Sequence, residues 1–241
     1  MNRIKTSLSV CVLLCLMFQS HAQRDTVRLG QPVSTYVKQS IAPVAMIGLG
    51  MYLKLHNSPI NNKSIQADVV SNFPNFHTSF DDYLAYAAYP IVYGFDWVGV
   101  KARTDFKNRT AILVKAEVLM VASVYALKYS NKEIRPDGSD DHSFPSGHTA
   151  QAFLGAVFLQ KELGQKSIVF PILGYTMATT VGVMRVLNNE HYLGDVLVGA
   201  GIGMLSAHIA YWTHRYKWNK NITVMPMYSQ KSAGVRFAMV F

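Results

Sequence analysis

Three short stretches of the sequence decide the fold, and in chain order they are Lys128–x6–Arg135–Pro136, Pro145-Ser146-Gly147-His148 and Arg185–x5–His191–x3–Asp195. Together they supply three cations, a hydroxyl, a glycine, two histidines and a carboxylate. Each stretch lies where an apolar, helix-like segment begins or ends. If neighbouring helices run antiparallel, the three stretches meet at one end of a helical bundle.

Outward from these stretches, the apolar segments predict five helices, over 83–100, 109–129, 148–163, 167–187 and 192–213. Pro90 and Pro171 are expected to start or kink their helices. Half of the residues are hydrophobic and 15% are charged, which is well below the usual quarter of charged residues. The last two segments are long and apolar enough to span a bilayer. We therefore predict an all-α bundle that is embedded in a membrane, with a packing role for the Gly199–Gly203 pair.

The N-terminal residues 1–22 have the features of a secretory signal peptide. A positive start is followed by an apolar run and by Ser20-His21-Ala22, where small residues suit cleavage. Both cysteines, Cys11 and Cys15, lie in this segment. The mature chain is therefore expected to have no disulfide, unless residues 1–22 stay as an uncleaved anchor.

Residues 23–82 are predicted to be an N-terminal extension, polar and extended over 23–39 and a loop over 56–82. The apolar stretch 41–55 between them is short for a membrane span, so we expect it to lie on the membrane surface or to pack on the bundle. The helical domain that carries the three stretches is expected over 83–220. The tail, 221–241, alternates apolar and other residues with a strand-like period, which predicts a short β-hairpin.

The residue types in the three stretches suit phosphoryl transfer. A transferring phosphoryl group spreads negative charge over its oxygens, and preorganised cations and N–H donors stabilise that charge. Lys128, Arg135 and Arg185 can supply the charge, and the guanidinium fork meets two phosphate oxygens at once. Ser146 can add a hydroxyl, and Gly147 allows close approach to a helix N-terminus, which favours an anion.

The two histidines can divide the remaining chemistry. His191 and Asp195 are four residues apart, so on a helix they share one face. The carboxylate can then accept one ring N–H and leave the other nitrogen free to attack phosphorus. His148 can protonate the leaving oxygen as a general acid.

These patterns resemble the three motifs of the type 2 phosphatidic acid phosphatase (PAP2) superfamily, KxxxxxxRP, PSGH and SRxxxxxHxxxD, over about residues 84–213. The resemblance implies an all-α core, a phosphohistidine intermediate and no metal or other cofactor. It also assigns phosphate binding to Lys128, Arg135, Ser146, Gly147 and Arg185, and catalysis to His148, His191 and Asp195. Met184 departs from the family, which has serine before the third-motif arginine.

The resulting prediction is a membrane phosphatase that acts on lipid phosphate monoesters or diphosphates. Candidate substrates are phosphatidic acid, phosphatidylglycerol phosphate, undecaprenyl diphosphate and a lipid A phosphate. The alternatives are a soluble periplasmic acid phosphatase of broad specificity, an inactive phosphate-binding membrane protein and, less favoured because of the chain's length, a vanadate-dependent haloperoxidase. No obligate protein partner is expected.

Charged residues then indicate sidedness and exclude other partners. The formal net charge is +9, but the excess sits in short loops rather than in one stripe, which argues against nucleic acid. Basic residues gather in 101–109, in 161–166 and after 213, at the end opposite the motifs. The positive-inside rule then places the site in the periplasm, in a bacterial inner membrane. The acidic stretch 137–142 is interpreted as a solvated loop rather than a metal site.

Overall fold

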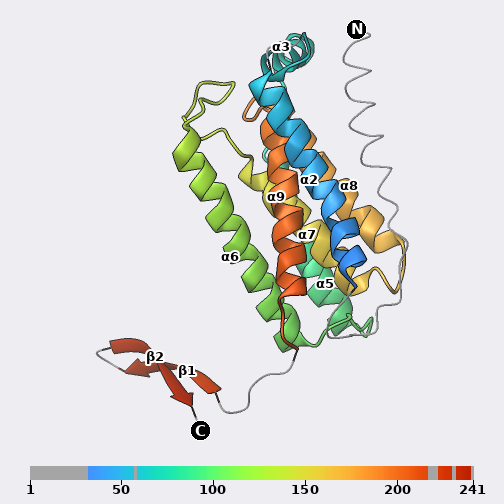
Figure 1. Cartoon of the computed structure of the whole chain (residues 1–241), viewed down its shortest axis with the longest axis vertical. Helices are drawn as coiled ribbons and strands as arrows, with labels where there is room; N and C mark the ends of the chain where they lie inside the picture. The colour runs from blue at the N-terminus through green and yellow to red at the C-terminus, as the bar shows by residue number, and fades with distance from the viewer. Residues whose placement is uncertain (1–31, 57–58, 217–221, 230–231, 240–241) are drawn as a thin grey trace.

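The computed structural model describes residues 32–56, 59–216, 222–229 and 232–239, so the predicted signal peptide lies outside it. The described chain forms a helical bundle followed by a β-hairpin (Figure 1). The elements are α2 (Val33–Leu55), α3 (Asn62–Asn72), α4 (Phe80–Leu84), α5 (Ala88–Trp97), α6 (Phe106–Asn131), α7 (Gly147–Leu163), α8 (Val169–Leu187), α9 (Leu193–Trp212), β1 (Ile222–Ser229) and β2 (Ser232–Met239). The predicted all-α bundle and the antiparallel hairpin are both confirmed.

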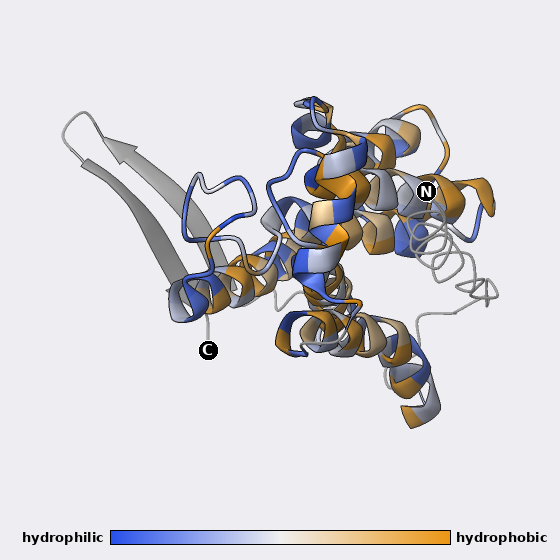
Figure 2. Ribbon diagram, turned by 90° about the horizontal axis from the view of Figure 1, so that it is seen from above, coloured by the Kyte–Doolittle hydropathy of each residue, from blue (hydrophilic) through white to orange (hydrophobic). Residues whose placement is uncertain are grey.

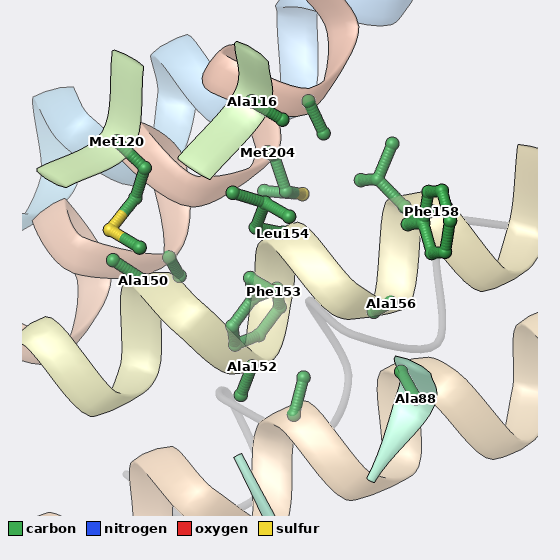
Figure 3. Packing of buried hydrophobic residues seen from close by; sticks show 14 of the residues in the cluster. Ala88, Ala116, Met120, Ala150, Ala152, Phe153, Leu154, Ala156, Phe158 and Met204 are labelled. Carbon is green, nitrogen blue, oxygen red and sulfur yellow. The ribbon is translucent and has the colours of Figure 1, made fainter. Parts of the chain in front are cut away.

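The centre of the bundle is α7, which is buried on almost all sides. A helix that is apolar all round belongs inside a protein. Leu154 and Phe158 of α7 are fully buried, and Figure 3 shows their side chains among those of Met120 on α6 and Met204 on α9. Because α6, α8 and α9 pack around α7, the ends of these helices are held together.

Glycines bring α9 against α7. A Cβ added at Gly199 would lie 2.3 Å from the Ser146 carbonyl oxygen, and one at Gly203 would lie 2.0 Å from that of Ala150. No side chain fits at either position, so the helix backbones can approach closely only because both residues are glycines. The expected packing role of this pair agrees with the geometry, and the contact at Ser146 places the start of α7 beside the start of α9.

Three helices are long and apolar enough to span a membrane, namely α6, α8 and α9. The outer surfaces of α6 and α8 carry exposed Val118, Val121, Val169 and Ile172. Figure 2 shows many apolar residues along the helices of the bundle. An apolar outer surface of this length suits lipid rather than water, which supports a membrane protein.

The N-terminal region differs from the prediction. Residues 33–39 were predicted to be extended, but they form the first turns of helix α2, which begins at Val33. Helix α2 runs antiparallel to α9 (Figure 1). A Cβ at Gly50 would lie 2.6 Å from the Gly194 oxygen, and one at Gly201 would lie 2.6 Å from the Pro43 oxygen. The polar residues of its first turns hid this helix from a hydropathy pattern. Helix α2 therefore packs on the bundle along α9, which is one of the two arrangements expected for residues 41–55.

The prediction of a loop over 56–82 was wrong. Asn61 caps α3 through a reciprocal capping box with Ser64, a signal that sequence reasoning overlooked. Helix α3 then binds the turn between α8 and α9, because Gln66 Nε2 donates to Asn189 Oδ1 at 2.7 Å and Asn62 Oδ1 accepts from the Gly194 N–H at 2.8 Å. The prediction also merged α4 and α5 into one helix over 83–100.

Candidate active site

The three motifs meet at one end of the bundle. Lys128 lies in the last turn of α6, Gly147 and His148 open α7, and Arg185 lies in the last turn of α8. The Ser146 N–H donates to the Asp195 carbonyl oxygen at 3.0 Å, which ties the second motif to the third. Lys128 Nζ donates to the His142 carbonyl oxygen and so holds the intervening loop against α6.

The His191–Asp195 pair is arranged differently from the prediction. Helix α9 begins at Leu193, so His191 precedes it rather than sharing a helical face with Asp195. Its Nδ1 lies 3.8 Å from Asp195 Oδ2, which is beyond direct hydrogen bonding. The Ser143 hydroxyl donates to Asp195 Oδ2 at 2.6 Å and lies 3.5 Å from His191 Nδ1. The Asp195 carboxylate is therefore linked to the His191 ring mainly through the Ser143 hydroxyl, which contacts both groups.

Asp195 also anchors the start of α9. Its Oδ2 accepts from the Tyr192 N–H at 3.1 Å, which closes the first turn. Its Oδ1 is buried and has no hydrogen-bond partner, and such a carboxylate oxygen is costly unless charge or a donor lies near. A protonated His191 imidazole would supply that charge, and the carboxylate is close enough to stabilise it.

The chemical state of His191 follows from its surroundings. The residue is 1% exposed. Burial, followed by the positive charges of Arg185, Lys128 and Arg135, holds its pKa well below the ordinary value. Both effects disfavour the protonated ring. At neutral pH the imidazole is therefore neutral and nucleophilic.

The two arginines are held by carboxylates that the sequence interpretation did not assign. Arg185 Nη1 lies 2.9 Å from Oδ2 of Asp81, which is fully buried. Arg135 Nε lies 2.9 Å from Asp140 Oδ2. Glu190 contacts both arginines through Oε2, at 3.2 Å from Arg135 Nη1 and in a direct ion pair with Arg185 Nη2.

His148 faces the same cluster from the first turn of α7. Its Nε2 lies 3.2 Å from Asp82 Oδ1. Burial and the Arg185 charge lower the pKa of His148 below its ordinary value, and the nearby Asp82 and Asp81 carboxylates offset only part of this shift. A general acid must carry a proton, so Asp82 opposes the two effects that would remove that proton.

Ser146 and Gly147 form the turn that starts α7. The Ser146 hydroxyl is buried, caps the helix at the Thr149 N–H and lies 2.9 Å from Thr149 Oγ1. This hydroxyl therefore has partners within the protein, and its contact with phosphate stays a prediction. Gly147 is the first helical residue, where N–H groups lack partners within the helix and favour an anion.

Several functional candidates had weak signals in the sequence. Ser143 lies two residues before the second motif, and Glu190 directly precedes His191. Asp81 and Asp82 lie in a short helix that was predicted to be mostly loop. Their roles depend on contacts that span up to about a hundred residues, such as Asp81 to Arg185, and neither spacing nor periodicity records such contacts.

The acidic stretch 137–142 forms a turn beside the site. Asp137 Oδ1 accepts from the Ser139 N–H and Asp140 Oδ1 accepts from the His142 N–H, at 2.9 and 2.8 Å. Asp141 pairs with the His142 ring. Over the described residues, no group of three or more His, Cys, Asp or Glu side chains is arranged to hold a metal ion. The loop carboxylates thus serve the turn and Arg135.

Comparison with known proteins adds independent information. The family model described as the PAP2 superfamily matches residues 70–219. A lipid A 1-phosphatase of Porphyromonas gingivalis is 45% identical over 94 residues, which are 39% of this chain and 21% of that protein. Lipid phosphate phosphatase 2 of Arabidopsis thaliana is 40% identical over 80 residues, which are 29% of this chain and 28% of that protein. The matches therefore span between about a fifth and somewhat over a quarter of the length of these two relatives.

Two solved structures are also similar. LpxE of Aquifex aeolicus is 23% identical with a TM-score of 0.46, and the match covers 60% of this chain and 93% of that chain. A PAP2-type phosphatidylglycerolphosphate phosphatase of Bacillus subtilis is 19% identical with a TM-score of 0.34, covering 88% of this chain and 95% of that chain.

Proposed function

The chain belongs to the PAP2 superfamily, and we propose that it hydrolyses lipid phosphate monoesters or diphosphates through a phosphohistidine intermediate. The observation that carries this proposal is a buried, neutral histidine at the same bundle end as two arginines and a lysine. His191 supplies a nucleophile, and the cations supply the charge that a phosphoryl group needs.

In the first step, His191 Nε2 attacks phosphorus, because Nδ1 faces Ser143 and Asp195. The bond from phosphorus to the lipid oxygen breaks, and His148 gives its proton to that oxygen. Lys128, Arg135, Arg185 and the Gly147 N–H bind the phosphoryl oxygens. Asp195 and Ser143 stabilise the positive charge that develops on the His191 ring.

In the second step, water attacks the phosphohistidine. His148, now neutral, takes a proton from that water. The nitrogen–phosphorus bond breaks, His191 returns to its neutral form, and inorganic phosphate leaves. The cycle uses side chains of this site, the Gly147 N–H and one water molecule, and no metal or other cofactor is proposed.

A lipid substrate is supported by the short helix α4, which has a polar and an apolar side. Asp81 and Asp82 contact Arg185 and His148, whereas Phe80 is 54% exposed. Tyr83, also on α4, is 77% exposed. Exposed aromatic rings beside a polar site favour the interface between headgroups and acyl chains. The two relatives described above are named for lipid A and for lipid phosphates, and we extend only their shared class, lipid phosphates, to this chain.

This placement predicts a substrate-dependent effect of the aromatic residues. The double variant Phe80→Ser/Tyr83→Ser should raise KM for phosphatidic acid in mixed micelles by about 5- to 30-fold, because each partly exposed ring contributes about 0.5–1 kcal/mol of apolar contact and each 1.4 kcal/mol is tenfold. With a soluble arylphosphate, KM should stay within about twofold of the wild type. Phosphate release would be measured with both substrates.

Trp97→Ser is the matched control, because Trp97 is an aromatic residue that is 90% exposed at the last position of α5 and is not part of the site. Equal losses with the two substrates in the α4 variant would indicate distortion of the site. They would favour the soluble acid phosphatase as the alternative function.

We also propose that the site faces the periplasm. The supporting observation is that Lys101, Lys107, Lys161 and Lys166 lie at the end of the bundle opposite the motifs, where the positive-inside rule predicts the cytoplasm. The proposed domain boundaries remain those predicted from the sequence, with residues 1–22 as a signal peptide and 221–241 as a separate tail.

Cysteine labelling tests this orientation. In a variant with Cys11 and Cys15 replaced by serine, an impermeant maleimide should label Ser139→Cys in intact spheroplasts. It should label Gln165→Cys only after permeabilisation. Both positions are exposed, at opposite ends of the bundle. The reverse labelling pattern would place the site in the cytoplasm. That arrangement would follow if residue 23 were exported and α2 then crossed the membrane.

A further inference from the structure

The Glu190 carboxylate joins the two arginines of the site. Its Oε2 lies 3.2 Å from Arg135 Nη1 and accepts a hydrogen bond from Arg185 Nη2. Two guanidinium groups that converge on one anionic oxygen reproduce the way arginines hold a phosphoryl oxygen. Among the ion pairs of the described residues, those of Glu190 are the ones that connect both arginines.

Neither arginine depends on Glu190 for its position. Arg185 also pairs with the buried Asp81, and Arg135 also pairs with Asp140. Each of these two carboxylates reaches one arginine of the pair. Removing Glu190 would thus leave each guanidinium group with a carboxylate that orients it. The contact of Glu190 with both arginines must therefore serve another purpose than positioning them.

The Glu190 side chain is also placed so that it can move away from the two arginines. Its side chain is 20% exposed, compared with 4% for Arg185. The turn that carries it is held elsewhere, because Asn189 Oδ1 accepts from Gln66 Nε2 of α3 at 2.7 Å. A rotation of the Glu190 side chain can therefore free the arginine donors while the main chain beside His191 stays in place.

We infer that Glu190 is an internal counter-anion that competes with phosphate for Arg135 and Arg185. This inference rests on the proposed function, since it takes the arginine pair as the phosphate site. A bound phosphoryl dianion needs the donors that Glu190 holds, and the two anions repel at short range. The carboxylate weakens binding of inorganic phosphate and favours release of this product after hydrolysis.

The test is direct binding of inorganic phosphate to detergent-purified protein by titration calorimetry. Glu190→Gln keeps the shape of the side chain and removes its charge. We expect the Kd for phosphate to fall by at least about fivefold, which is the lower end of typical coupling between two ligands. The inhibition constant for orthovanadate should fall in parallel, because vanadate would occupy the same arginine pair.

Asp141→Asn is the matched control, because it removes one negative charge from the loop beside the site, where Asp141 pairs with the His142 ring. Its Kd for phosphate should change by less than about twofold. An equal fall in both variants would reduce the effect to general charge and overturn the inference. An unchanged or higher Kd in Glu190→Gln, with a lower kcat, would make Glu190 a positioning residue instead.

The same experiment separates this inference from the proposed function. Phosphate binding by the wild type without tighter binding by Glu190→Gln would refute only the role of Glu190. An absence of phosphate and vanadate binding in the wild type and in every variant would refute the phosphate site itself, and the inference with it.

Discussion

Replacing His191 by alanine should lower kcat for phosphate release by at least about 10⁴-fold, since removal of a nucleophile eliminates the covalent route. His191→Gln should behave in the same way. The alanine variant leaves a cavity at a fully buried position, so the glutamine variant and a thermal unfolding curve for both establish that the fold survives. Phosphate release from phosphatidic acid in detergent is the measurement.

His142→Ala is the matched control for a histidine beside the site. Its ring pairs with Asp141 and its side chain is 38% exposed, so kcat should remain within about threefold of the wild type. Substantial activity in both His191 variants would remove the nucleophile assignment.

The neutral state of His191 also predicts how the rate depends on pH. Because its pKa lies well below the ordinary value, the acid limb of the pH–rate profile should fall below pH 6.5.

Replacing Asp195 by asparagine should lower kcat by about 10²- to 10⁴-fold, because the ring of His191 loses the charge that stabilises its protonated form. The asparagine keeps an oxygen that can accept from Ser143 and from the Tyr192 N–H, so α9 should still start correctly. KM should change little, since the carboxylate does not bind substrate. Steady-state kinetics with a soluble arylphosphate and with lipid would be compared.

Ser143→Ala provides the comparison that separates orientation from charge. It removes the hydroxyl between ring and carboxylate but keeps the negative charge, so its loss in kcat should be smaller, about 10-fold. A near-normal kcat in Asp195→Asn would argue against the pair. A larger loss in Ser143→Ala than in Asp195→Asn would show that the hydroxyl, rather than the carboxylate, is what His191 requires.

The order and spacing of the motifs were sufficient to predict the end of the bundle where they meet. Polar residues at the ends of long apolar segments lie at the ends of a helical bundle, and antiparallel helices bring Lys128, His148 and Arg185 together at one of them. The four helices from α6 to α9 were predicted within a few residues of their observed bounds for the same reason. The C-terminal hairpin followed from an alternating pattern.

The contacts around the motifs could not be predicted in this way. The i, i+4 spacing of His191 and Asp195 suggested a shared helical face, but the helix starts later and Ser143 enters between them. The first turns of α2 and all of α3 were missed, because their stability comes from packing and capping rather than from an apolar period. The acidic partners of the arginines belong to this second category, since tertiary contact alone selects them.

The measurement that tests the account most directly is the trapping of the intermediate. Wild-type protein would be mixed with ³²P-labelled phosphatidic acid in the presence of EDTA and quenched within milliseconds. We expect label that is stable to base and labile to acid on the peptide that contains His191, and none in His191→Gln. Phosphate release without any trapped label on this peptide, or equal labelling in the variant, would contradict nucleophilic catalysis by His191.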